Sequence, residues 1–256
     1  MHASQSMAAP PQVLLTREAG KNDKLMSALR ERGVSAYEMP LIFSANGPDK
    51  QSLPEELKLI WNWIVLTSPE AAAVFLEGWQ QAGRPQVRIA VVGQGTANIL
   101  EAFPGFDKKS IAFMPTKADG QTLASTLPGQ REGVTVLYPA SVKAPTDVQD
   151  ILKSRGFICK MIRTYTTKTV ERLTSEQQEA ASSAQVVTFA SPSAIKAWVS
   201  HCGGLDSQKP VACIGKTTGN AAKKLGLLHV FHPDNPGISG FVDAIMEALA
   251  FQPKGK

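Results

Sequence analysis

The chain has 256 residues, of which 43% are hydrophobic and 19% are charged, and its formal net charge is +5. This composition is typical of a folded globular protein with one large or two modest domains, and no apolar run approaches the roughly 18 residues of a membrane-spanning helix. The three cysteines lack the CxxC spacing of a zinc site, and no basic stripe with interleaved aromatic residues indicates binding of DNA or RNA.

The first half of the chain alternates short hydrophobic segments with helix-forming ones. Residues 1–11 have no apolar signal-peptide core and are predicted to be a disordered lead-in. Pro40 confines the segment around it to a sheet edge or a linker. The predicted elements are, in chain order, a strand at 13–16, a helix at 21–32, an extended segment at 35–43, a loop at 45–50, a short helix at 54–61, a strand at 64–67 with a helix to 81, a strand at 87–92 with a helix from 93, a strand at 111–114 and a helix at 121–127.

The second half repeats this pattern. Its predicted elements are a strand at 134–138, a loop at 139–143, a helix at 147–155, an extended segment at 157–167, a polar helix at 171–183, a strand at 187–190 with a helix, a strand at 210–214 with a helix to 225, a strand at 228–232 and a helix at 241–250. An offset of 123 residues separates Val13 from Val136 and also Ser68 from Ser191. Such offsets indicate an internal duplication of about 120 residues. The alternation predicts two α/β domains with parallel sheets and a ligand cleft between them.

The most distinctive repeated feature is a Ser-Pro pair between a buried strand and a helix, at Ser68-Pro69 and Ser191-Pro192. Serine is a preferred N-cap and proline suits the first helical position, so each pair predicts a strand–helix junction. Free N–H groups and the positive end of the helix dipole favour a carboxylate or a phosphate there. Plain helix capping is the alternative, and the duplication favours binding because it sets two such junctions at one expected cleft.

Two glycine turns, GQGTA at 93–97 and GKTTG at 215–219, also open helices after buried strands. Asn98 stands where a dinucleotide fingerprint needs its third glycine, and no Walker A spacing occurs, so both arguments disfavour a nucleotide site. Arg17 and Lys143 follow corresponding strands of the two copies, and each is either a solvated charge or a ligand for a carboxylate. The four histidines show no metal-binding spacing.

Several segments together resemble the uroporphyrinogen-III synthase family, namely VLLTRE, VLTSPEAA, VVGQGTA, YPASVKA, RTYTT, FASPSAIKAW, CIGKTTGNAA and PGISGFVDAIMEAL. The resemblance runs from residue 13 to residue 249, and GPD, TSPEA and YPASVKA are most similar to plastid-located plant members. It implies two flavodoxin-like α/β domains joined by a two-stranded β-ribbon. The implied bounds are 12–37 plus 168–250 for one domain, 45–160 for the other, and 38–44 with 161–167 for the ribbon.

The resemblance implies a cofactor-independent hydro-lyase, which cyclises hydroxymethylbilane to uroporphyrinogen III with inversion of ring D, loss of water and a spiro intermediate. The substrate is a linear tetrapyrrole with eight carboxylates, which suits two sets of helix N-termini. Tyr165 matches the ribbon tyrosine of the family and is the expected catalytic residue. No metal or other cofactor is expected. The expected substrate-binding residues are Arg17, Ser68, Gly93, Gly95, Thr96, Lys143, Ser191, Ser193, Gly215, Thr217 and Thr218.

The expected context is tetrapyrrole biosynthesis, leading to haem and chlorophyll, in the chloroplast stroma, or in the cytoplasm for a bacterial member. A monomer is expected, with no nucleic-acid or membrane partner and with transient handover of substrate from hydroxymethylbilane synthase. Two other classes stay open: a two-lobed small-molecule binding protein without catalysis and a nucleotide-dependent enzyme. The porphyrin isomer formed from hydroxymethylbilane separates these three hypotheses.

Overall fold

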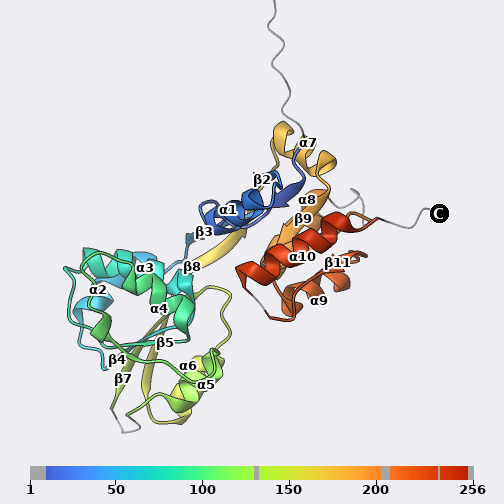
Figure 1. Cartoon of the computed structure of the whole chain (residues 1–256). Coiled ribbons are helices and arrows are strands. Elements are labelled where there is room, and N and C mark those ends of the chain that lie inside the picture. The colour runs from blue at the N-terminus through green and yellow to red at the C-terminus, as the bar shows by residue number, and fades with distance from the viewer. Residues whose placement is uncertain (1–9, 130–132, 203–207, 236, 253–256) are drawn as a thin grey trace, which may run out of the picture. The chain divides into compact units, whose positions relative to one another are not determined.

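The structure is a computed structural model that describes residues 10–129, 133–202, 208–235 and 237–252. The lead-in predicted at residues 1–11 therefore lies almost entirely outside the described residues. The chain divides into two compact units (Figure 1). Unit 1 consists of Met1–Phe43 and Lys168–Lys256, and unit 2 is the continuous segment Ser44–Thr167.

Unit 2 is built on a six-stranded sheet with the strand order β3-β8-β7-β4-β5-β6. From β8 to β6, every neighbouring pair of strands is parallel. β4 is a continuous buried run, WIVL, as expected of a parallel strand that is covered on both faces. The strands are β3 (Ile42–Asn46), β4 (Trp63–Leu66), β5 (Ile89–Val91), β6 (Ile111–Phe113), β7 (Thr135–Ser141) and β8 (Ile158–Thr169).

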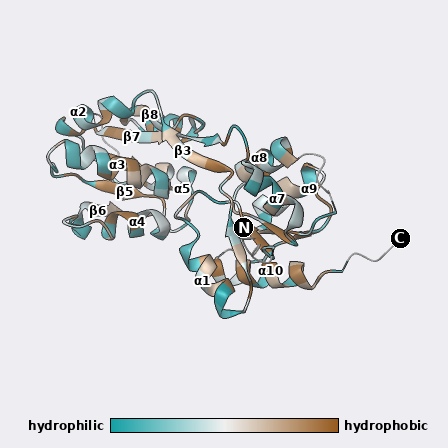
Figure 2. Ribbon diagram, turned by 90° about the horizontal axis from the view of Figure 1, so that it is seen from above, coloured by the Kyte–Doolittle hydropathy of each residue, from teal (hydrophilic) through white to brown (hydrophobic). Residues whose placement is uncertain are grey.

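Helices cover both faces of this sheet. Side chains alternate along each strand, so successive residues pack against the helices on opposite faces. Ile64 and Leu66 of β4 pack with α2, α3 and α4, whereas Trp63 and Val65 pack with α5 and α6. Figure 2 shows the strands as largely hydrophobic and the helices as carrying hydrophilic residues. The helices are α2 (Leu53–Lys58), α3 (Pro69–Gln81), α4 (Gln94–Glu101), α5 (Gly120–Thr126) and α6 (Asp147–Ser154), with 3-10 turns η1 (Lys50–Ser52) and η2 (Lys108–Ser110).

Unit 1 is built on a five-stranded parallel sheet with the order β11-β10-β9-β1-β2. Val187 and Phe189 of β9 pack with α7, α8 and α9, whereas Val186 packs with α1 and α10. The elements are β1 (Val13–Leu15), α1 (Asp23–Glu31), β2 (Ala36–Glu38), α7 (Ser175–Ser183), β9 (Val186–Phe189), α8 (Pro192–Cys202), β10 (Val211–Cys213), α9 (Lys216–Lys224), β11 (Val230–Phe231) and α10 (Ile238–Ala250).

The two sheets share one topology. The order β8-β7-β4-β5-β6 of unit 2 matches the order β2-β1-β9-β10-β11 of unit 1. In unit 2 the pair β7 and β8 comes last along the chain, whereas its counterpart, β1 and β2, comes first in unit 1. The two copies are therefore circular permutations of each other. The predicted pair of parallel α/β sheets is confirmed, and the shared topology agrees with an internal duplication.

The chain passes from one unit to the other twice, in β3 and in β8, and these strands are hydrogen-bonded neighbours. Gly47 N donates to Thr164 O, and Val170 N donates to Leu41 O, each at 3.0 Å. The residue numbers run in opposite directions along the two strands, so the pair is antiparallel. Pro40 lies between β2 and β3, which are both edge strands, as the sequence predicted.

Several predicted boundaries are wrong, among them the following three. The predicted loop at 139–143 is wrong because β7 continues through Pro139 to Ser141. Proline is tolerated there because β7 pairs with β4 only as far as Leu137, and Pro139 pairs with β8 alone. β3 extends to Asn46, into the predicted loop at 45–50. α7 begins at Ser175 and not at 171, because Thr174 caps it in a capping box with Gln177.

Candidate functional site

The predicted site residues of unit 2 lie at the carboxyl ends of neighbouring strands. Ser68 follows β4, Gly93 follows β5, Lys143 follows β7, and Tyr165 lies in the second half of β8. Because β8, β7, β4 and β5 are consecutive and parallel, these residues share one edge of the sheet. Ligands of parallel α/β sheets bind at this edge, so we expect a ligand of unit 2 to contact these residues.

Ser68 and Tyr165 form a hydrogen bond. The Tyr165 hydroxyl lies 2.8 Å from Ser68 Oγ, and either group can be the donor. Ser68 is also the N-cap of α3, where its Oγ accepts from Ala71 N at 3.0 Å and Pro69 takes the first helical position. Tyr165 is only 7% exposed, with its ring in the core beneath α3. The predicted catalytic residue, Tyr165, and the predicted capping serine, Ser68, are therefore hydrogen-bonded to each other.

A second tyrosine, Tyr138, is hydrogen-bonded to Thr67, the residue before Ser68. The Tyr138 hydroxyl lies 3.1 Å from Thr67 Oγ1. Tyr138 comes from β7 and packs with α5 and α6, on the opposite face of the sheet from Tyr165. Burial raises the pKa of the Tyr138 phenol, against the hydrogen bond with Thr67 and the positive charge of Arg163, which lower it. Sequence reasoning missed Tyr138, whose only signal was its position at the end of a hydrophobic run.

The glycine turn after β5 brings a helix N-terminus to the same edge. Gly93 is the N-cap of α4 in extended backbone, with φ 179° and ψ 177°. A Cβ on Gly93 would lie 2.9 Å from the Cβ of Ala118, so glycine permits the close approach of the segment before α5. Gly95 faces open space, and Thr96 is buried in the first turn. This turn therefore presents backbone N–H groups beside the Ser68 junction.

Two cations lie near the loop after β7. Lys143 Nζ donates to Thr167 O at 2.7 Å. The guanidinium of Arg163 donates from Nη1 to Ser141 O at 2.8 Å and to Ala144 O at 2.6 Å. Sequence reasoning missed Arg163, although it stands two residues before Tyr165 in RTYTT. Arg163 fixes the loop that carries Lys143.

The predicted residues of unit 1 also gather at the carboxyl edge of their own sheet. Ser191 Oγ accepts from Ala194 N at 3.3 Å, which is the same cap as that of Ser68. Gly215 has the same extended backbone as Gly93, with φ 179° and ψ 177°. The unit 1 set is Arg17 after β1, Ser191 and Ser193 at the start of α8, and Gly215, Thr217 and Thr218 at the start of α9.

Asp119 is a carboxylate at the strand ends of unit 2 whose partners are well defined. Asp119 is the N-cap of α5, and its Oδ1 accepts from Thr122 N at 2.7 Å. Lys117 Nζ lies 3.0 Å from Asp119 Oδ2. The hydrogen bond from Thr122 N, followed by the contact with Lys117, lowers the pKa of Asp119 to about 2. This carboxylate is therefore ionised at neutral pH and stabilises the start of α5.

The three cysteines are buried, and their thiols have raised pKa values. Burial raises the pKa of Cys159 to about 11 and that of Cys213 to about 12, and it raises the pKa of Cys202 as well. These thiols are therefore protonated at neutral pH and are poor nucleophiles. Within the described residues, no group of three or more His, Cys, Asp or Glu side chains is arranged to hold a metal ion.

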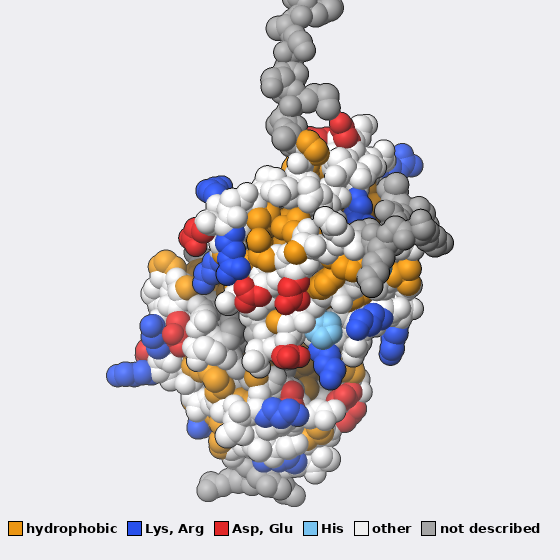
Figure 3. All heavy atoms as spheres, turned by 45° about the vertical axis from the view of Figure 1, so that its right-hand side comes forward, with side chains coloured by type: hydrophobic (Ala, Val, Ile, Leu, Met, Phe, Trp, Pro, Cys, Tyr) orange, Lys and Arg blue, Asp and Glu red, His pale blue; other side chains and the backbone are white. Residues whose placement is uncertain are grey.

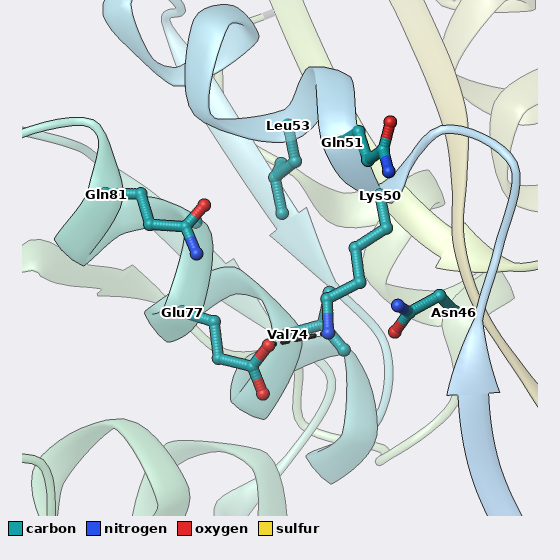
Figure 4. A pocket seen from close by; sticks show the side chains of 8 residues that line it. Asn46, Lys50, Gln51, Leu53, Val74, Glu77 and Gln81 are labelled. Carbon is teal, nitrogen blue, oxygen red and sulfur yellow. Dashed lines mark ion pairs between the residues drawn. The ribbon is translucent and has the colours of Figure 1, made fainter.

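A separate pocket of about 260 Å³ lies in unit 2 between β3, η1, α2 and α3 (Figure 4). Lys50 Nζ and Glu77 Oε2 form an ion pair at 2.6 Å across it. None of the predicted site residues lines this pocket. The lining residues are Asn46, Lys50, Gln51, Leu53, Val74, Glu77, Gly78 and Gln81.

The face of the molecule shown in Figure 3 is mixed in charge. On the face shown in Figure 3, Lys and Arg side chains are interspersed with Asp and Glu and do not form a stripe. No helix in the described ranges is both long and apolar enough to span a bilayer. The structure thus has two parallel α/β sheets with helix N-termini at the carboxyl ends of their strands. This arrangement is typical of proteins that bind small anionic molecules.

Comparison with known proteins narrows this class. A family model described as "Uroporphyrinogen-III synthase HemD" matches residues 23–243, so the chain belongs to that family. A curated relative from Oryza sativa subsp. japonica, "Uroporphyrinogen-III synthase, chloroplastic", is 47% identical over 249 residues, which are 95% of this chain and 82% of the relative. A uroporphyrinogen-III synthase from Chlorobaculum parvum is 25% identical over 93% of this chain and 98% of its own length.

Solved structures support the fold. A mutant uroporphyrinogen III synthase from the extremely thermophilic bacterium Thermus thermophilus has a TM-score of 0.59 at 14% identity and covers 93% of this chain and 98% of its own. The uroporphyrinogen-III synthetase of Helicobacter pylori has a TM-score of 0.60 at 16% identity, over 93% of this chain and 99% of its own. The two-domain α/β fold identified from the sequence is therefore shared with these enzymes.

Proposed function

We propose that the protein is a uroporphyrinogen-III synthase, a cyclising hydro-lyase of tetrapyrrole biosynthesis. Its substrate is the linear tetrapyrrole hydroxymethylbilane, and its product is uroporphyrinogen III with ring D inverted. Membership of the family and 47% identity to a rice enzyme of this name support the activity. The geometric observation that carries it is the hydrogen bond between Ser68 and Tyr165, 2.8 Å long, at the ligand-binding edge of unit 2.

Substrate binding depends on the strand-end residues of both units. Helix N-termini present N–H groups and a positive dipole end, which favour the carboxylates of the substrate. In unit 2 the binding residues are Ser68, Gly93, Gly95, Thr96 and Lys143, and in unit 1 they are Arg17, Ser191, Ser193, Gly215, Thr217 and Thr218. Backbone N–H groups in the turns that begin at Gly93 and Gly215 contribute to binding along with the side chains, because both glycines are N-caps that lack a capping side chain.

The chemical step begins with loss of water. The C–O bond of the hydroxymethyl group breaks, and the hydroxyl leaves as water together with the proton that the pyrrole N–H of the same ring gives up, which generates a neutral, electrophilic azafulvene. Tyr165 donates a hydrogen bond to the departing oxygen. Ser68 Oγ is its present partner and keeps the Tyr165 hydroxyl oriented until substrate arrives.

The product isomer is decided by positioning. The substituted carbon of ring D attacks the azafulvene and forms a spiro intermediate, which then fragments and recloses with ring D inverted. End-to-end closure without the enzyme gives the type I isomer. Holding the chain in the folded conformation is therefore the main contribution of the binding residues, and none of these steps is assigned to a metal or an organic cofactor.

The biological context follows from the relatives. The rice relative is chloroplastic, and we place this chain in the plastid on that similarity. We propose a monomer that receives hydroxymethylbilane by transient handover from the enzyme that makes it. A small-molecule binding protein of the same fold would bind the substrate without turnover, and the isomer assay below distinguishes it.

The test supplies freshly generated hydroxymethylbilane to the purified full chain and resolves the oxidised porphyrin isomers. We expect uroporphyrin III in excess over uroporphyrin I, with the excess increasing with enzyme concentration. A reaction without protein gives the type I baseline. Only type I product at every enzyme concentration would contradict the synthase function, and tight binding without turnover would support the binding-protein alternative.

A further inference from the structure

Two residues at the start of unit 2, Gly47 and Asp49, make close contact with the backbone of β8. Gly47 N donates to Thr164 O at 3.0 Å, and Asp49 N donates to Arg163 O at 3.0 Å. In return, Asp49 Oδ2 accepts from Arg163 N at 2.6 Å. A Cβ on Gly47 would clash with the carbonyl group of Arg163, so only glycine permits this approach. We call Gly47, Pro48 and Asp49 the clasp.

The clasp holds β8 at a bulge. β7 and β8 pair residue by residue until Ala140 faces Arg163, and the next residue, Ser141, faces Tyr165. Thr164 is therefore the extra residue on β8. Its side chain is fully buried, and its Oγ1 has no hydrogen-bond partner among the described residues. Such a group is unfavourable by itself, so contacts outside Thr164 must stabilise the bulge.

The bulge determines the face on which Tyr165 lies. Cys159 and Met161 pack on the face of α5 and α6, and Ile162 packs on the face of α2, α3 and α4. Regular alternation would send residue 165 to the face of Cys159, because side chains alternate with a period of two. Tyr165 instead packs with Ile162, and from that face its hydroxyl contacts Ser68.

Arg163 of β8 also supports the loop after β7. The backbone of Arg163 is bound by Asp49, and its guanidinium donates to Ser141 O and Ala144 O. Backbone and side chain of this one residue thus connect the clasp to the loop that carries Lys143. Displacement of Arg163 would affect Tyr165 through the bulge and Lys143 through this loop.

We propose that Asp49 is a positioning residue for catalysis, which acts through the bulge at Thr164 to hold the Tyr165 hydroxyl against Ser68. This inference rests on the proposed function for its kinetic consequence, although the geometric consequence is independent of it. At β8 the carboxylate of Asp49 accepts from the backbone N–H of Arg163, so in this scheme it touches neither substrate nor the reacting atoms. The Asp49 carboxylate is thus an acceptor that fixes the backbone of β8.

The kinetic test compares Asp49→Ala and Asp49→Asn in the full-length enzyme. Asparagine keeps an oxygen that accepts from Arg163 N, whereas alanine does not. Loss of a charge-assisted hydrogen bond suggests about a 10-fold fall in kcat for Asp49→Ala, with KM changed less, and recovery to within about 2-fold for Asp49→Asn. Asp107→Ala is the matched control, because Asp107 Oδ1 also accepts a backbone N–H, from Lys109 at 3.0 Å, but away from β8.

A double-mutant cycle shows whether the effect passes through Tyr165. If it does, Asp49→Ala changes kcat by less than about 2-fold in the Tyr165→Phe background. Equal fold-losses in both backgrounds would overturn the proposal and assign Asp49 a general structural role. The same loss of kcat in Asp107→Ala would overturn it too.

A spectroscopic readout separates this inference from the enzyme function. The chain has three tyrosines, so ¹³C labelling of the phenol carbon gives three NMR signals, of which Tyr165→Phe assigns one. We expect Asp49→Ala to shift the Tyr165 signal, and Asp49→Asn and Asp107→Ala to leave it in place. An unmoved Tyr165 signal in folded Asp49→Ala would overturn the proposal whether or not the wild type makes uroporphyrinogen III.

Discussion

The two Ser-Pro junctions have the same cap but different surroundings. Ser68 and Ser191 each accept the N–H of the residue three positions on, at 3.0 Å and 3.3 Å. Ser68 also bonds Tyr165, and its neighbour Thr67 bonds Tyr138. Among the described residues, Ser191 Oγ has no second hydrogen bond to a side chain. The Ser68 junction is therefore fixed by tyrosines from both faces of its sheet, whereas within the described ranges the Ser191 junction has the N-cap hydrogen bond without such tyrosine contacts.

The duplication explains this difference. At the offset of 123 residues, Tyr138 corresponds to Leu15 and Thr67 to Ala190. Neither Leu15 nor Ala190 has a side chain that can form a hydrogen bond. The backbone cradle is thus common to both copies, while the tyrosine contacts belong to unit 2 alone. We infer that unit 2 supplies the chemical group and that the Ser191 junction supplies binding only.

The largest expected effect comes from Tyr165→Phe. Removing a hydrogen-bond donor to a departing oxygen lowers kcat by about 100-fold, which corresponds to about 2.7 kcal/mol. The matched variant is Tyr138→Phe, which removes the other tyrosine hydroxyl at the same junction. Steady-state kinetics of uroporphyrinogen III formation measure both.

Two results of this comparison would contradict the role assigned to Tyr165. We expect Tyr138→Phe to lose less than about 10-fold in kcat, because its hydroxyl bonds Thr67 and only orients the junction. Full activity of Tyr165→Phe would end its catalytic assignment. Equal losses in both variants would mean that junction rigidity, and not a donor at the reacting oxygen, controls the rate.

Local sequence signals predicted the backbone of the site well. The Ser-Pro pairs became N-caps with proline at the first helical position, because this preference depends on a few adjacent residues. Gly33 and Gly156 end α1 and α6 with φ of +71° and +86°, as glycine after a helix predicts. Repetition at a constant offset was enough to assign these junctions to equivalent strands.

Contacts between distant segments were not predictable in the same way. The bulge at Thr164 depends on Asp49, which is more than a hundred residues earlier, and the segment RTYTT gives no sign of an extra residue. Pro139 misled the prediction because a proline usually ends a buried strand, whereas here β8 alone pairs with it. Tyr138 meets Thr67 only in the folded sheet, where β7 and β4 are neighbours, so the sequence alone did not indicate its role.

A smaller effect should distinguish Ser68→Ala from Ser191→Ala. Each variant loses an N-cap, which costs about 1 kcal/mol of folding free energy, as measured by urea unfolding. Ser68→Ala also removes the hydrogen bond between Ser68 Oγ and the Tyr165 hydroxyl, so we expect kcat to fall by about 5- to 10-fold. Ser191→Ala should raise KM with little change in kcat, because that junction only binds. A fall in kcat for Ser191→Ala as large as that for Ser68→Ala would contradict the division of roles.

The smallest expected effect concerns acid stability, and it again differs between the units. α5 of unit 2 is capped by Asp119, whose folded-state pKa is about 2 against an ordinary value of 3.8, whereas the N-cap of α10 in unit 1 is Gly237. A lowered folded-state pKa means that the charged form stabilises the fold above pH 3.8 and that this contribution is lost as the pH falls from 3.8 to about 2.

Asp119→Asn keeps an oxygen to cap α5 but removes this charge, so it should flatten that pH dependence. We expect the wild type to have the higher Tm at pH 6 and the difference in Tm to shrink towards zero by about pH 2, because the protonated wild-type carboxyl resembles the amide. Amide hydrogen exchange localises the change: Thr122 N–H, which Asp119 binds, should lose protection on acidification in the wild type. A Tm difference that stays constant from about pH 6 to about pH 2 would show that the charge of Asp119 does not stabilise unit 2, since only its shape would then matter.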